Sequence, residues 1–174
     1  SKNKVSDEDL LTSPSGMTVY MARLYSHLPL EDFKYMAKWG LNKNAWLGGL
    51  GGDGTGESIN RDDICRSFVG EDNAYWDEAF TSMHDANHLI ETLPNYRSNY
   101  NSEMQYNEFL GEGYFVRAFV LYQMARRYGG VPLAIKQIDY HPENRDNIEL
   151  PRAAEEETWE QICAAVTKVA DLLP

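Results

Sequence analysis

The segment of residues 111–133, GEGYFVRAFVLYQMARRYGGVPL, constrains the fold more than any other part of the chain. In this segment and just before it, apolar side chains recur at steps of three and four residues, the spacing of one face of an α-helix: Phe109, Leu110, Val116, Val120, Leu121, Met124 and Tyr128. Gly129 can adopt the left-handed conformation that ends a helix, and Pro132 cannot continue one. The pattern predicts a long amphipathic helix with an extended exit, whose apolar face other elements must cover.

Two earlier segments have the same periodicity. The first runs from about Pro14, a favoured first-turn residue that follows the cap residue Ser13, and it ends at Pro29. The second stops before Pro94 and carries these side chains in phase: Trp76, Ala79, Phe80, Met83, Asn87 and Ile90. Both segments therefore predict helices that bury one face.

A last helix is predicted near the end of the chain, with Trp159, Ile162, Val166, Val169 and Leu173 in phase. Its first turn carries three glutamates, residues 155–157, where negative charge suits the helix dipole. The central helix is predicted from about Ser102 to Tyr128. These four segments predict an all-α fold of paired antiparallel helices, in which residues 29–72 and 96–107 form long irregular loops.

Length and composition limit the function. A chain of 174 residues with 43% hydrophobic content is long enough for a single helical domain, residues 1–174, with a real core. Its net charge of −11 repels phosphate backbones and anionic lipid, so we expect no nucleic-acid partner. No apolar run approaches the roughly 20 residues that cross a bilayer, and the sequence begins without a signal-like segment.

Four blocks of sequence carry a family resemblance. In order they are SDEDLLTSPSGMTVYMARLYSHL at 6–28, YWDEAFTSMHDANHLIETL at 75–93, the central helix at 111–133 and PRAAEEETWEQICAAVTKVADLLP at 151–174. Each block alone is weak, but their order and spacing make the joint match specific. Together they cover about half of the chain, and they resemble the SusD/RagB family of nutrient-binding outer-membrane lipoproteins of Bacteroidetes.

This resemblance implies a fold of tetratricopeptide-like helix pairs, without a cofactor. It further implies binding of oligosaccharide or polysaccharide at the cell surface and delivery to a SusC-type TonB-dependent transporter. Family members are several hundred residues long and carry an N-terminal lipid anchor that this chain lacks, so we expect it to be an N-terminal portion. Arg117 matches the family's helix arginine, which we interpret as structural, pairing with a carboxylate or capping a carbonyl. The family's hydroxyl cap before the last helix is replaced by Ala153 and Ala154.

Candidate ligand-binding residues lie in the two long loops. Trp39, Trp46 and Asn44 belong to the first loop, and Tyr96 and Tyr100 belong to the second. A sugar ring has a C–H face and a rim of hydroxyls, so flat aromatic surfaces flanked by amides can bind both. The alternative is that each ring fills a small core under its loop. Trp76 and Trp159 are in phase with apolar helix faces, so we interpret them as core residues.

Several motifs fail on their context. Residues 49–54, GLGGDG, satisfy GxGxxG, but no strand precedes them and no helix follows. The carboxylates between Asp53 and Asp63 lack the spacing of a helix-loop-helix calcium site. His84 and His88 have the i, i+4 spacing of a zinc pair, but the helix phase places them outside the apolar face, as solvated side chains, and we predict no metal.

The two cysteines give no disulfide framework. Cys163 lies beside Ile162, where we expect a small buried side chain, and the oxidation state of Cys65 and Cys163 stays open.

Three classes of function remain from the sequence. The resemblance favours a non-catalytic glycan-binding protein. A helical protein–protein interaction scaffold without glycan binding is the alternative, since paired helices often bind peptides. A glycoside hydrolase needs two carboxyl groups across a cleft, and no motif fixes such a pair among 27 acidic residues, so we predict that the protein is not an enzyme.

Overall fold

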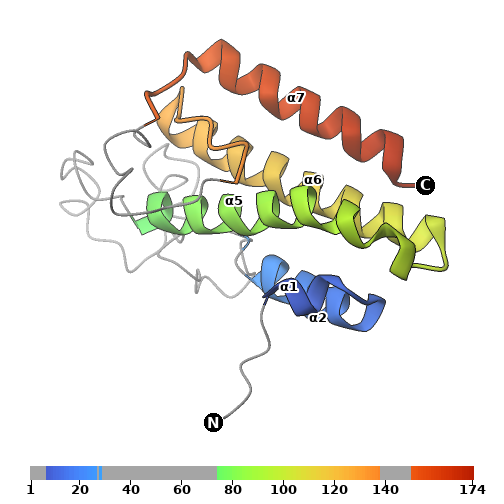
Figure 1. Ribbon diagram of the computed structural model, residues 1–174. Coiled ribbons are helices and arrows are strands. Elements are labelled where there is room, and N and C mark those ends of the chain that lie inside the picture. Colours follow the sequence, from blue (N-terminus) through green and yellow to red (C-terminus); the bar gives the residue numbers. More distant parts are fainter. Residues whose placement is uncertain (1–6, 27, 29–73, 138–149) are drawn as a thin grey trace, which may run out of the picture. The chain divides into compact units, whose positions relative to one another are not determined.

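The regular elements that the structure describes are all helices (Figure 1). The computed structural model describes residues 7–26, 28, 74–137 and 150–174. The chain divides into two compact units, residues 1–28 with 79–174, and residues 29–78. In order, the elements are α1 (Asp7–Leu11), α2 (Pro14–Ser26), α5 (Ala74–Thr92), the 3₁₀ helix η2 (Leu93–Asn99), α6 (Glu103–Tyr128) and α7 (Glu155–Leu172). The predicted all-α class is confirmed. None of the described helices is long and apolar enough to span a membrane.

The first unit is built around helix α6. Helix α7 packs along one side of α6, while α5 and the α1–α2 hairpin lie on other sides of it (Figure 1). Gly111 of α6 lies against Leu172 and Leu173, whereas Gly113 lies against Leu89 of α5. Residues two apart on a helix point to nearly opposite sides, so α6 has two buried faces. We had predicted one apolar face for α6. That prediction was incomplete, because α6 has neighbours on several sides.

Both ends of α6 lie where the sequence predicts them. The Ser102 side chain accepts a hydrogen bond from the backbone N–H of Gln105 at 3.2 Å, as an N-cap does. Gly129 has a φ of 69°, and its N–H donates to the Ala125 carbonyl at 2.9 Å. The helix therefore begins and ends where local sequence chemistry favours it.

The α1–α2 hairpin is fixed by a similar cap and by contact with α5. The Ser13 hydroxyl accepts from the Gly16 N–H at 3.2 Å, which confirms the predicted start of α2. Tyr20 is fully buried, and its hydroxyl donates to the Asp85 carbonyl at 2.7 Å. Helix α1 was not predicted, because five residues are too few to show a periodicity.

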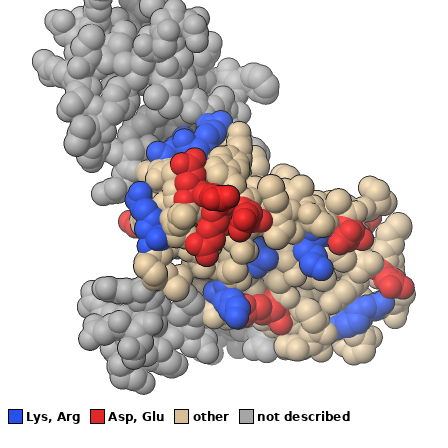
Figure 2. All heavy atoms as spheres, turned by 90° about the horizontal axis from the view of Figure 1, so that it is seen from above, with Lys and Arg blue, Asp and Glu red and all other residues tan. Residues whose placement is uncertain are grey.

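Helix α7 starts without a side-chain cap, as Ala154 led us to expect. The fully buried Thr158 makes two hydrogen bonds in this region. Its hydroxyl donates to the Ala154 carbonyl at 3.1 Å and accepts from the Val131 N–H at 3.3 Å. The Ala153 N–H donates to the Val131 carbonyl at 3.2 Å. The start of α7 is thereby joined to the chain that leaves α6. The acidic first turn of α7 lies on the face of the protein that Figure 2 shows.

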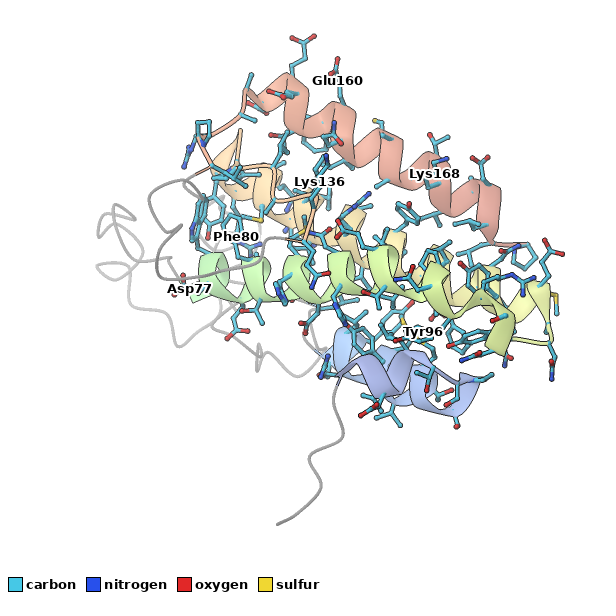
Figure 3. All side chains as sticks on the ribbon, viewed as in Figure 1. Asp77, Phe80, Tyr96, Lys136, Glu160 and Lys168 are labelled. Carbon is cyan, nitrogen blue, oxygen red and sulfur yellow. The ribbon has the colours of Figure 1, made fainter. Side chains whose placement is uncertain are left out.

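Asn87 and Arg117 hold the extended segment 131–137 against α5 and α6. The Asn87 Nδ2 donates to the carbonyls of Ala134 at 2.6 Å and Lys136 at 3.2 Å. The Arg117 Nη1 donates to the Asn87 Oδ1 at 3.3 Å and to the Ile135 carbonyl at 3.1 Å. Three successive carbonyls of the segment are thus bound by two side chains, near the position of Lys136 in Figure 3. The structural role predicted for Arg117 takes the form of carbonyl capping.

We predict that Asn87→Ala destabilises the protein by about 2–3 kcal/mol, because it leaves two partly buried carbonyls and one guanidinium N–H without the buried Asn87 amide as their partner. Urea unfolding followed by circular dichroism measures the change. The matched control is Asn99→Ala, since the exposed Asn99 donates only to the Thr12 carbonyl at 3.0 Å. Its expected loss is below about 1 kcal/mol. Equal losses in the two variants would contradict the assigned role of Asn87.

Gly130→Ala is expected to destabilise the protein by about 2 kcal/mol or more, because a Cβ there would overlap the Ala153 carbonyl oxygen of the backbone. Gly113→Ala is the control. Its Cβ would lie 2.7 Å from the Cδ2 of Leu89, the mobile end of a side chain, and alanine favours the helix by about 1 kcal/mol. Thermal unfolding should therefore rank the Gly130 variant well below the Gly113 variant.

Candidate functional site

The corner between α5 and α6 holds the two described candidates, Tyr96 and Tyr100. Tyr96 lies in η2, is half-buried, and points to the side of the α1–α2 hairpin (Figure 3). Trp39, Trp46 and Asn44 lie outside the described residues, as do the GLGGDG segment and Cys65. Tyr96 therefore remains a candidate for ligand contact.

Tyr100 is a packing residue in the structure. It is only 3% exposed, and its hydroxyl donates to the Leu11 carbonyl at 2.7 Å. Its ring meets the rings of Tyr106 and Phe109 edge to face, at centroid distances of 5.7 and 6.2 Å. Burial, with a smaller effect of Tyr106, raises the pKa of Tyr100 to about 12. The expectation that Tyr100 offers a flat face to a ligand is corrected here, because both its ring and its hydroxyl are used inside the protein.

Arg97 and Asn99 make the corner rigid. The Arg97 Nη1 donates to the Tyr100 carbonyl at 3.1 Å, and its guanidinium lies 4.9 Å from the centroid of the Tyr106 ring. The amide of Asn99 binds the Thr12 carbonyl between α1 and α2. This second loop is thus a 3₁₀ turn with a short link to α6, where we had predicted an irregular segment. Tyr96 is consequently presented from a fixed backbone.

His84 and His88 have different surroundings. His84 is exposed beside Asp85, with 3.4 Å between its Nδ1 and the Asp85 Oδ1. His88 is half-buried against Tyr20 of α2, with ring centroids 6.3 Å apart, and its Nδ1 lies 3.4 Å from the Thr92 hydroxyl. The prediction of a solvated His88 was wrong because α2 covers that side of α5. In the described part of the chain, no three His, Cys, Asp or Glu side chains are placed to hold a metal ion.

Three other predictions concern the burial of single side chains in α5 and α7. Cys163 is exposed, so the expected buried thiol was wrong: the buried face of α7 consists of Thr158, Ile162 and Ala165. Trp159 is half-buried, with its ring edge against Tyr122 at 5.9 Å and its Nε1 donating to Glu155 at 3.3 Å. Trp76, in the first turn of α5, is also half-buried. We had predicted both tryptophans as core residues. Both indoles are instead only partly buried.

Three partly exposed aromatic residues lie on the surface of the helices, and none of them was predicted as a site residue. Tyr25 of α2 is 37% exposed, and Phe115 and Tyr122 of α6 are 38% and 37% exposed. For the two residues of α6, the sequence shows a pattern that could have indicated a second aromatic face of the helix. Phe115, Phe119 and Tyr122 recur at steps of four and three residues, on a side of α6 away from the apolar face that we predicted.

Comparison with known families decides the class of this chain. Residues 52–174 match the SusD-like family that is described as starch-binding and associating with the outer membrane. The chain belongs to this SusD-like family. The match covers three of the four sequence blocks in which we saw the SusD/RagB resemblance, which is thereby confirmed. No curated protein matches the chain by sequence.

Solved structures of SusD-like proteins have the same fold. A SusD homolog from Bacteroides thetaiotaomicron is 18% identical, with a TM-score of 0.69 over 99% of this chain. A SusD-like carbohydrate binding protein from Bacteroides fragilis is 17% identical, with a TM-score of 0.68 over 95% of this chain. A second SusD-like protein from Bacteroides fragilis is 20% identical, with a TM-score of 0.64 over 98%. This chain spans about a third (32%) of the length of each of them.

We predict that Tyr100→Phe destabilises the protein by about 1–2 kcal/mol at pH 8, because the Leu11 carbonyl loses its buried donor. The folded pKa of about 12 lies above the ordinary value of 10, so the neutral hydroxyl stabilises the fold below pH 10. That stabilisation is lost as the pH rises towards 12. The stability difference between wild type and Tyr100→Phe should therefore shrink from pH 8 to pH 12 in urea unfolding, whereas the control Tyr122→Phe should show little difference at either pH.

Proposed function

We propose that this protein binds glycans at the surface of the bacterial outer membrane without cleaving them, and delivers them to a SusC-type TonB-dependent transporter. The observation that carries the proposal is the family match over residues 52–174, because that family is described as starch-binding and associating with the outer membrane. The carbohydrate binding named for the similar Bacteroides fragilis protein agrees with it.

The proposed platform consists of Trp39 and Trp46, with Asn44 as a hydrogen-bonding amide, and Tyr96 is proposed as a separate ligand contact. Indole and phenol rings pack on the C–H face of a sugar, and the amide meets its hydroxyls. The segment with the two tryptophans connects α2 to α5 in sequence, and the Tyr20–Asp85 hydrogen bond joins these helices directly. The helices on either side of the segment in sequence are therefore held together, which supports a ligand-binding role for the segment.

The proposed role is transport rather than catalysis. Attachment to the outer membrane would come from an N-terminal lipid anchor, as the SusD/RagB resemblance implies. Delivery predicts that the protein co-purifies with a transporter barrel from outer membranes. Incubation of soluble starch with the protein should release no reducing sugar, whereas a hydrolase would release it steadily.

We predict that the wild-type protein is retarded in native gels that contain soluble starch. The double variant Trp39→Ala, Trp46→Ala should bind about tenfold more weakly, since each stacked ring contributes about 0.5–1.5 kcal/mol. Tyr96→Ala should weaken binding by a smaller factor. The control is Trp159→Ala, because Trp159 is packed on Tyr122 of α6, and its binding should match wild type while circular dichroism confirms the fold.

Two results would contradict the proposal. Unretarded migration of wild type with starch and with other soluble polysaccharides would exclude a glycan-binding function. Retardation that is unchanged in the double tryptophan variant would exclude the platform while leaving glycan binding in place.

A further inference from the structure

A strip of three aromatic rings crosses from α2 to α6 on the surface of the first unit. The rings of Tyr25 and Phe115 lie 6.4 Å apart at an interplanar angle of 30°. Those of Phe115 and Phe119 lie 5.9 Å apart at 32°. The first two rings are 37% and 38% exposed, and Phe119 is half-buried. Neighbouring rings that are tilted by only about 30° present a continuous apolar surface to solvent.

Two glutamates border this aromatic strip. Glu108 and Glu112 lie on the same side of α6 as Phe115 and Phe119, because the four residues follow the steps 4, 3 and 4. Both are half-buried, and like charges four residues apart repel each other. Burial, with an added effect of Glu108, raises the pKa of Glu112. Within the described structure neither carboxylate has a hydrogen bond or an ion pair, so their acceptor capacity is unused.

Tyr122, the other exposed aromatic residue of this helix face, has ring and cation partners within the protein. The guanidinium of Arg126 lies 5.7 Å from the centroid of the Tyr122 ring, and Trp159 packs its edge against the same ring. Trp159 in turn donates its N–H to Glu155. Tyr122 thus has partners within the protein, whereas the strip of Tyr25, Phe115 and Phe119 combines open ring surface with unpaired acceptors.

We propose that the aromatic strip of Tyr25, Phe115 and Phe119, with Glu108 and Glu112, is a second glycan-binding surface that holds sugar rings of the same ligand class. This inference rests on the proposed glycan-binding function. It concerns a different part of the protein, since its residues lie on helices α2 and α6 and not in the loop segments.

The chemistry of a pyranose fits both halves of this surface. Its C–H face packs on aromatic rings, and its hydroxyls donate hydrogen bonds that a carboxylate accepts strongly. A neutral sugar also binds without adding charge to a site that already holds two repelling carboxylates. Because Phe115 has a neighbouring ring on each of two helices, the surface offers more than one ring to a ligand and fits a chain of several sugars better than a single residue.

Isothermal titration of the full 174-residue chain with maltoheptaose tests this surface. Phe115→Ala is expected to weaken binding about fivefold, through the loss of the most central ring. Glu112→Gln is expected to weaken it about threefold, because a neutral amide is a poorer acceptor for hydroxyl donors. This second variant relieves the repulsion from Glu108, so it should fold at least as stably as wild type. The matched control is Tyr122→Ala, on the same helix face, with an unchanged affinity.

The outcomes separate this inference from the proposed function. Weaker binding in Phe115→Ala and Glu112→Gln, with Tyr122→Ala unchanged, supports the second surface. Wild-type affinity in both strip variants, combined with weaker binding in the double tryptophan variant, overturns the second surface alone. No binding of maltoheptaose or soluble starch by the wild-type chain overturns both proposals.

Discussion

The hydrogen bonds of Asn87 and Arg117 are the constraint on which the first unit depends. Asn87 is 1% exposed, and its amide has to be paired because an unsatisfied buried amide costs about 1–3 kcal/mol. It uses both its donor and its acceptor, on Ala134, Lys136 and Arg117. Burial lowers the pKa of the Arg117 guanidinium, and Tyr114 and Glu91 oppose that change. The Nε of Arg117 stays buried without a partner, and such an unpaired polar atom lowers the stability of the fold. The network therefore fixes the position of segment 131–137 but does not satisfy all of its own polar atoms.

Because this network binds the chain just after α6, it determines where α7 can start. The segment leaves α6 at Gly129, passes so close to Ala153 that only glycine fits at Gly130, and binds Thr158 through Val131. The Gln137 N–H also donates to the Glu91 side chain at 2.9 Å. Helices α5, α6 and α7 are therefore fixed to one another by backbone groups as well as by apolar packing. A scaffold of this kind keeps its surface rings at constant spacing, which multi-ring contact with a glycan requires.

The helices could be predicted from the sequence because their ends have local causes. Ser13, Ser102, Gly129 and the uncapped Ala154 act through neighbouring backbone groups, so their effects are visible within a few residues of sequence. The neighbours of each helix have no such local signal. Periodicity gave the phase of α5, but only the position of α2 buries His88 against Tyr20.

The candidate site was harder to predict for the same reason. Tyr100 stands in a polar, turn-like stretch of sequence, yet its hydroxyl is paired with Leu11, 89 positions away. Cys163 follows a buried isoleucine, but one step along a helix turns the side chain by about 100°, and here that step leads to solvent. Family resemblance supplied the family and, through it, the proposed function, because four spaced blocks together carry information that no single loop residue carries.

The partners of each tyrosine hydroxyl separate the packing rings from the candidate binding rings. Tyr20 and Tyr100 each donate to a backbone carbonyl at 2.7 Å, and both rings are buried. A phenol satisfied in this way gains nothing from a ligand. The phenol of Tyr25 is placed differently, since partial burial, with a smaller effect of the Glu112 carboxylate, raises its pKa while its ring stays 37% exposed. An aromatic ring held at the surface beside an unpaired acceptor is poorly explained by packing alone, and a polyhydroxylated ligand would satisfy both groups at once.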